Sequence, residues 1–382
     1  MSLICNRRWI GLLAGASLLA LSGCEQPSSE VDVVSGASPM LEMLGEEMPV
    51  RQIPNMPPSG EAYYAPDNYH LIVQTMDPDA QHPEGRETGP LTYVYTDDGA
   101  VARRINDRGQ DACSWVFPDQ KRILWTSTRD RMDMPLGDWS DPNNYPQGAE
   151  LYTSDMHGKD VQRLTDNEYY EAEVSISPDG QWITFVREID GNINLWRMRP
   201  DGSDEQRITY TIDWQPGAPI YMADSETIMF QAWRSDSVGK DEPTPMTVFT
   251  INHDGSNLKQ RTFDNGMYWG PAPIADGRHY LYTSIVEGGN YELFVGDLAG
   301  DDPVRLTWRT GFDGMKSISH DGQKMLFSRA TDDGPELYVH VMDLSSLNMG
   351  AENFQGIPET PIPDDPIFVA DFTVHACRWS QC

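Results

Sequence analysis

The chain is short of basic residues and has no apolar run long enough to cross a membrane. Of its 382 residues, 28 are Lys or Arg and 59 are Asp or Glu, which gives a formal net charge of −31. Such an excess repels nucleic acid and anionic lipid headgroups, so it argues against a nucleic-acid role and favours cationic partners or divalent ions, unless it reflects only a salty habitat. The longest apolar stretch, Trp9 to Leu21, is shorter than the about 20 residues that a transmembrane helix needs.

This N-terminal stretch has the pattern of a secretory signal, because Arg7 and Arg8 precede the apolar run. The run ends in Leu21-Ser22-Gly23-Cys24, which resembles the lipobox of bacterial lipoproteins, where the cysteine is acylated and the chain is cut just before it. We therefore predict a lipoprotein signal peptide at residues 1–23, followed at 24–60 by an acylated Cys24 and a flexible tether. An ordinary signal peptide that happens to contain a cysteine is the alternative.

Removal of residues 1–23 would leave 26 Lys or Arg against 59 Asp or Glu, a net charge of −33. The residue after the acylated cysteine is Glu25, whereas an Asp there resembles an inner-membrane retention signal. The predicted location is therefore the periplasmic side of the outer membrane. Contact with the membrane would be through the lipid anchor (palmitate among its acyl chains) alone, since several chains anchor a protein stably.

Cysteine is scarce, with five in the chain. Cys5 would leave with the signal peptide and Cys24 would carry lipid, so Cys113, Cys377 and Cys382 remain. An oxidising periplasm favours one disulfide and one thiol left over. Cys377 and Cys382 are the most local pair, but the sequence does not choose among the three pairings.

A turn containing Asp, followed by a strand of large apolar residues, recurs six times at intervals of 45 to 60 residues. Its aspartates are Asp67, Asp119, Asp179, Asp224, Asp276 and Asp321. Each unit continues with a second hairpin that turns at a glycine, as at Asp201-Gly202, and several close with Arg-Leu-Thr or Arg-Ile-Thr. Four short strands in such a period predict an all-β fold, a six-bladed β-propeller of four-stranded blades over residues 61–347.

The turn Ser177-Pro178-Asp179-Gly180, the aromatic strand after it, the Asp-Gly hairpin and the Arg-Ile-Thr ending together resemble the WD40-like (PD40) repeats of the TolB propeller family. Two departures from TolB are that residues 25–60 are too few for its α/β domain and that TolB carries no lipid anchor. The resemblance implies a TolB-like propeller and leaves function open. The C-terminal tail, residues 348–382, contains an alternating stretch at Ile367–Val374 that could complete blade six or close the ring against blade one.

In a blade whose strands are called a to d from the axis outward, the Asp turns join a to b and the glycine hairpins join c to d, on what we call the turn face. We expect the six aspartates to be structural, because Asp caps turns through its own backbone. The b–c and d–a connections lie on the opposite, loop face, where long insertions fall at 76–89, 129–148 and 234–245. The predicted binding face consists of Trp139, Tyr169, Tyr170, Glu171, Trp214, Tyr268, Trp269, Trp308 and Phe312. For each of these residues, the alternative is that its side chain packs between blades.

These features predict a non-catalytic envelope lipoprotein that binds an envelope protein or a cell-wall glycan through the loop face. The alternative is a carbohydrate-active enzyme, a polysaccharide lyase or a glycosidase, that uses carboxylates of the same face. The candidate carboxylates are Asp138, Asp141, Glu168, Glu171, Glu173, Asp213 and Asp313. No catalytic residue is assigned. The histidines suggest no metal triad of the kind used by similar oligogalacturonate lyases, and no cofactor is predicted. Ca²⁺ could bind the carboxylates, although no complete alternating Asp/Asn loop is present.

Overall fold

A computed structural model describes residues 48–364 and 366, apart from 78–88, 136, 142, 241–242 and 332–333. The predicted signal peptide, Cys24, the segment Ile367–Val374, Cys377 and Cys382 lie outside the described residues. Among the described residues, no helix is both long and apolar enough to cross a membrane.

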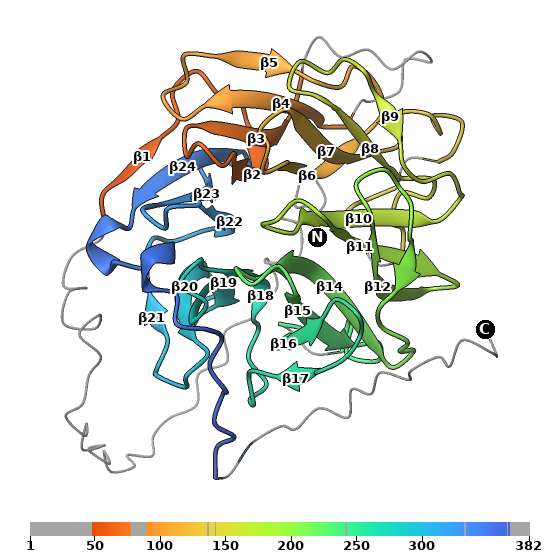
Figure 1. Cartoon of the computed structure of the whole chain (residues 1–382). Helices are drawn as coiled ribbons and strands as arrows, with labels where there is room; N and C mark the ends of the chain where they lie inside the picture. The colour runs from red at the N-terminus through yellow and green to blue at the C-terminus, as the bar shows by residue number, and fades with distance from the viewer. Residues whose placement is uncertain are drawn as a thin grey trace, which may run out of the picture.

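Six four-stranded antiparallel sheets surround a common axis, which confirms the predicted six-bladed propeller (Figure 1). The innermost strands are β2 (Ser59–Tyr64), β6 (Asp111–Val116), β10 (Tyr170–Ile176), β14 (Trp214–Tyr221), β18 (Trp269–Pro273) and β22 (Asp313–Ile318). The second strands are β3 (His70–Thr75), β7 (Arg122–Ser127), β11 (Ile183–Ile189), β15 (Thr227–Arg234), β19 (His279–Ile285) and β23 (Lys324–Ala330). The third are β4 (Leu91–Thr96), β8 (Glu150–Asp155), β12 (Asn192–Met198), β16 (Thr247–Asn252), β20 (Tyr291–Asp297) and β24 (Leu337–Asp343). The outermost are β5 (Ala102–Arg104), β9 (Gln162–Arg163), β13 (Gln206–Arg207), β17 (Lys259–Gln260), β21 (Val304–Arg305) and β1 (Val50–Gln52).

The six turn aspartates act alike. In each, Oδ1 accepts a hydrogen bond of 2.9–3.0 Å from the backbone N–H two residues further along. Asp67, Asp224 and Asp276 also accept from the N–H three residues on. These bonds close the a–b turn of each blade, which is the geometry that the repeat predicts.

The ring is closed by β1, which is the outermost strand of blade six and pairs antiparallel with β24. Val50 lies opposite Met342, and Gln52 lies opposite His340. This corrects the prediction that residues 24–60 are a tether throughout, since the segment from Met48 onward belongs to the propeller. The four strands of blade six are thus β1, β24, β23 and β22. The segment Ile367–Val374, predicted to complete blade six or to close the ring against blade one, lies outside the described residues.

Apolar side chains fill the space between neighbouring blades. One cluster joins blades one and two through Ile72, Val94, Ile123 and Trp125, all without solvent exposure. Equivalent clusters join blades six and one, five and six, and four and five. The largest extends over blades two to four and includes Trp269 of blade five and Met315 of blade six. Each blade therefore buries its two faces against its neighbours, as one isolated sheet could not.

After β24 the chain forms two short 3-10 helices, Ser345–Leu347 and Ala351–Asn353. The segment that follows lies over the turn face, where Phe354 is next to Gly277 and Pro361 is next to Gly300. Arg261 of blade four donates hydrogen bonds to the carbonyl oxygen of Pro358 (3.0 Å) and to Oγ1 of Thr360 (3.1 Å). Lys259 pairs with Glu359. The segment after blade six therefore packs as far back as blade four.

Candidate functional site

A β-bulge interrupts the pairing of every innermost strand with its neighbour at the same place. The first bulge residue has a left-handed backbone in all six blades, with φ between 27° and 57°. These residues are Glu61, Cys113, Glu173, Ala218, Gly270 and Met315. Only one of them is glycine, although left-handed backbone is uncommon for other residues. The bulges therefore place six chemically different residues around the axis.

The bulges connect neighbouring blades through hydrogen bonds. The N–H of Cys113 donates to Oε2 of Glu61 over 3.3 Å, and the N–H of Ala218 donates to Oε2 of Glu173. In blade five, the N–H of Gly270 donates to Oε1 of Gln231 over 2.5 Å.

Lys316 of blade six makes the converse contact, because its Nζ donates to the carbonyl oxygens of Trp269 (2.8 Å) and Gly270. Charged side chains on the axis thus bind the backbone of an adjacent or nearby blade.

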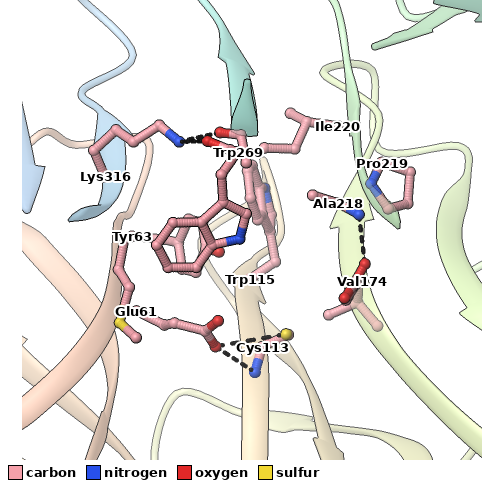
Figure 2. Close-up of a pocket in the computed structure, with 13 residues that line it drawn as sticks. Glu61, Tyr63, Cys113, Trp115, Val174, Ala218, Pro219, Ile220, Trp269 and Lys316 are labelled. Carbon is pink, nitrogen blue, oxygen red and sulfur yellow. Dashed lines mark hydrogen bonds between the residues drawn. The ribbon is translucent and has the colours of Figure 1, made fainter. Parts of the chain in front are cut away.

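A small cavity of about 70 Å³ lies on the axis and takes lining residues from all six innermost strands (Figure 2). Its polar wall includes Glu61, Glu173, Lys316 and the thiol of Cys113. Its other walls include the rings of Tyr63, Trp115 and Trp269 and the side chain of Ile220. The volume would accommodate on the order of five water-sized groups, so it fits a small ligand or the end of a larger one.

Burial governs the ionisation of these groups. It raises the pKa of the Glu61 carboxyl, and it raises that of the Cys113 thiol well above its usual value. It lowers the pKa of Lys316 to about 7. Because a thiol reacts as the thiolate, Cys113 is not an activated nucleophile.

Most residues of the predicted binding face are buried, which corrects that prediction. Tyr170, Glu171 and Trp214 are at most 2% exposed, and Trp139 is 4% exposed. Their rings pack within and between the blades: Trp139 and Tyr170 have centroids 6.0 Å apart, and Trp214 meets Phe249 edge-on at 5.8 Å.

The other aromatic residues of that group differ among themselves. Tyr268 is half-buried against Tyr282 and donates to Asp264 over 3.0 Å. Phe312 is half-buried against Trp269, which lines the axial cavity. Of the predicted group, Tyr169 (40% exposed) and Trp308 (45%) are the members with a large exposed surface.

Several candidate carboxylates have structural partners instead. Glu171 is buried against Arg187, which also binds Glu205. Asp313 forms a two-pronged pair with Arg329, with bonds of 2.7 and 2.8 Å. Asp138 and Asp141 each cap a backbone N–H within the long loop of blade two. Glu168 and Asp213 are exposed on loop-face connections.

Of the carboxylates proposed from sequence, Glu173 is the one that lines the cavity. Glu61, Cys113 and Lys316 also belong to this site and were not predicted from the sequence. The sequence does contain a signal for these positions, because each left-handed bulge residue lies six positions before the turn aspartate of its blade. Glu61 precedes Asp67 and Cys113 precedes Asp119 in this way, and the other four blades follow the same spacing. Alignment of the six copies on their aspartates would have identified this position.

No group of three or more His, Cys, Asp or Glu side chains within the described ranges is placed to hold a metal ion. Cys113 is a free, buried thiol.

No family model matches the chain. "Uncharacterized protein Atu1656" of Agrobacterium fabrum is 28% identical over 201 residues, which are 50% of this chain and 60% of that protein. The chain therefore spans less than two thirds of the length of this curated relative.

Solved structures with a similar fold share little sequence with the chain. TolB from Acinetobacter baumannii has a TM-score of 0.52 at 16% identity, with 74% of this chain and 65% of that one covered. A putative TolB from Agrobacterium tumefaciens has a TM-score of 0.51 at 16% identity, covering 75% and 90%. The gluconolactonase XC5397 from Xanthomonas campestris has a TM-score of 0.52 at 13% identity, covering 78% and 89%. Such likeness shows the fold and leaves the activity open. The chain is therefore a six-bladed β-propeller whose fold is similar to that of TolB.

Proposed function

We propose that the chain is a non-catalytic envelope lipoprotein that binds a protein or cell-wall partner through its loop face. The observation that carries this proposal is the distribution of exposed large apolar side chains. Of the nine exposed large apolar side chains among the described residues, five lie on loop-face connections: Met76, Tyr169, Ile212, Val238 and Trp308. The other four are Tyr69 and Val101 on the turn face, and Phe354 and Ile362 in the segment after blade six.

Three of these residues occupy the same kind of connection. Tyr169, Ile212 and Trp308 follow the outermost strands of blades two, three and five, where the chain returns to the axis. Ile212 is 71% exposed, an unusual placement for a residue type that is mostly buried. Apolar groups presented by several loops of a rigid scaffold are typical of a binding surface.

The charge around these side chains indicates the complementary partner. Glu168 and Asp213 are exposed next to Tyr169 and Ile212, and the chain as a whole carries a large negative charge. Apolar centres with acidic neighbours fit a partner that has an apolar patch with a basic rim.

The test is in-cell crosslinking of the tagged protein, with identification of what co-purifies by mass spectrometry. A variant with Tyr169→Ala, Ile212→Ala and Trp308→Ala should lose the partner. The matched control, Tyr69→Ala with Val101→Ala, removes exposed apolar groups from the turn face and should keep it. Equal capture by both variants would exclude the loop face as the binding surface.

For the carbohydrate-active alternative, the axial cavity offers two carboxylates, Glu61 and Glu173. A cavity of about 70 Å³ has too little room for a chain of sugar rings, and the outer carboxylates Glu171 and Asp313 are held by arginines. No observation favours this alternative over binding. If crosslinking yields no protein, assays of a polysaccharide panel for new reducing ends or unsaturated sugars follow.

The lipid anchor is part of the proposal and has its own test. The support is the Leu-Ser-Gly-Cys sequence at positions 21–24, after a short apolar run with basic residues before it. Cells fed a clickable palmitate analogue should label the wild-type protein and not the Cys24→Ala variant. Labelling of both would contradict the assignment, and fractionation of the labelled envelope tests the outer-membrane location.

A further inference from the structure

The residue directly after the outermost strand of each blade has the same backbone contact in all six blades. Its N–H donates to a carbonyl oxygen of the third strand over 2.8–3.0 Å. In five blades this residue is apolar: Ile53, Ile105, Leu164, Ile208 and Leu306. In blade four it is Arg261, which is 7% exposed. Blade four therefore has a buried guanidinium at a position that is apolar in every other blade.

Arg261 takes most of its hydrogen-bond acceptors from residues 354–361, which we call the strap. Its Nε donates to Oγ1 of Thr250 in its own blade over 2.8 Å. Its Nη1 donates to the strap, at the carbonyl oxygen of Pro358 (3.0 Å) and at Oγ1 of Thr360 (3.1 Å). Burial lowers the pKa of this guanidinium. Because a buried charged group without acceptors is costly, the strap supplies what Arg261 needs.

The c–d hairpins show that the strap lies where neighbouring blades otherwise meet. In blades two to four, the hairpin glycine faces the carbonyl oxygen of the closing residue of the preceding blade. A methyl group on Gly158, Gly202 or Gly255 would meet that oxygen at 2.3–3.1 Å. In blade five, a methyl group on Gly300 would instead meet the ring of Pro361 at 3.1 Å. The strap thus fills a groove between blades four and five that these other junctions close by direct contact.

Few contacts hold the rest of the strap. Ile357 packs, half-buried, against the apolar cluster between blades four and five. Glu359 is exposed and pairs with Lys259. No residue of the strap is buried, and Phe354 is 42% exposed. Segments with few buried contacts open at a low cost in free energy, so the strap should detach far more readily than a strand of a blade.

We propose that the groove between blades four and five is a peptide-binding site for an extended, proline-containing segment of a partner protein, with the strap as its exchangeable internal ligand. The strap shows the chemistry that the groove accepts, which is an apolar side chain followed by a proline, with a carbonyl oxygen and a hydroxyl group bonded to Arg261. Prolines keep such a segment extended before it binds, which lowers the entropy cost of ordering it. The groove opens on the turn face, so it is separate from the loop face of the proposed function, and neither depends on the other.

The test protein is the full-length Ile357→Asp variant, which removes the apolar anchor of the strap and leaves the groove unchanged. The probe is a fluorescein-labelled peptide with the sequence of residues 353–363, and fluorescence anisotropy measures its binding. We expect saturable binding to the variant. The wild type should bind the peptide about tenfold more weakly or less, because its attached strap competes at the high effective concentration of an intramolecular ligand. A peptide that itself carries the Ile357→Asp change should bind neither protein.

Addition of Arg261→Leu to the test protein is the decisive change. Leucine is the residue of blades two and five at this position, so the fold should tolerate it. The peptide should bind about tenfold more weakly or less, because the bonds from the guanidinium are lost. Lys121→Leu is the matched control, since it removes a positive charge from an exposed position of the turn face and should leave the affinity unchanged.

If Ile357→Asp does not fold, Glu359→Lys with Thr360→Ala replaces it, because this pair of changes turns the contact with Lys259 into a repulsion and removes a bond to Arg261. Three results would overturn the proposal. They are no saturable binding of the peptide to the released variants, binding undiminished by Arg261→Leu, and wild-type dimers in light scattering that Arg261→Leu abolishes, which would assign the groove to the strap of a second copy.

Discussion

Ile53 offers the sharpest test of ring closure by the N-terminal strand. It follows β1, has no solvent exposure, and its N–H donates to the carbonyl oxygen of Val339 over 3.0 Å. Its side chain packs in the cluster between blades six and one, with Leu326 and Val341. Ile53→Ala removes three carbon atoms, about 2.4 kcal/mol of transfer free energy at ~0.8 kcal/mol each, and adds a cavity cost.

The expected loss is about 3–4 kcal/mol in the free energy of unfolding, which for a protein of this size lowers the melting temperature by roughly 5 °C. Chemical denaturation followed by tryptophan fluorescence and a calorimetric melt measure the two quantities. Gln52→Ala is the control, because Gln52 is an exposed residue of the same strand. If the two variants have the same melting temperature, residues 50–53 do not close the ring and the assignment of β1 is wrong.

Three further predictions concern buried polar groups. Asp313→Ala should cost about 3–5 kcal/mol in urea denaturation, because it leaves the buried Arg329 charge without its carboxylate, whereas Asp236→Ala at an exposed pair should cost under about 1 kcal/mol. Lys316 has a pKa of about 7 in the folded protein and one near 10.4 in the unfolded chain. Between pH 7 and pH 10.4 the unfolded chain therefore binds more protons than the folded protein, so the free energy of unfolding should rise with pH. From pH 7 to 9 this adds about 2 kcal/mol, and denaturation of Lys316→Met at both pH values should lack the increase. The Cys113 thiol should resist a disulfide reagent in the native protein and react on unfolding, while rapid native labelling at this position would contradict its burial.

The blades could be predicted from sequence because their signals are local. An aspartate bonds the N–H two residues on, and a glycine supplies the positive φ of a hairpin, so both leave the same short pattern in every copy. β1 left no such pattern, since Val50–Gln52 is three residues long and pairs with a strand almost three hundred positions away. Nothing in a three-residue segment specifies so distant a partner, and it was assigned to the tether.

The binding-face prediction failed for a related reason. An aromatic residue in a d–a connection can point to solvent, as Trp308 does, or into the space between blades, as Trp214 does. In the sequence, Trp214 and Trp308 are both surrounded by polar residues and residues typical of turns. Trp214 begins β14 and Trp308 stands outside any strand, a difference of a few positions in element boundaries. Boundaries are the part of a structure that sequence patterns locate least well, so burial could not be assigned residue by residue.

The residues around the axis show most clearly that the repeat determines the backbone conformation and leaves the side chain undetermined. The backbone at the sixth position before each turn aspartate is the same in all six blades, left-handed and bulged, while the residue there is Glu, Cys, Glu, Ala, Gly or Met. The turn needs the backbone at this position and no particular side chain, so the residue can differ from blade to blade while the backbone stays the same. In a ring, six such positions meet around one space, so their side chains set the charge and the volume of the cavity together. This propeller places carboxylates at blades one and three, which is why the axis, as well as the loop face, is where its ligands should be sought.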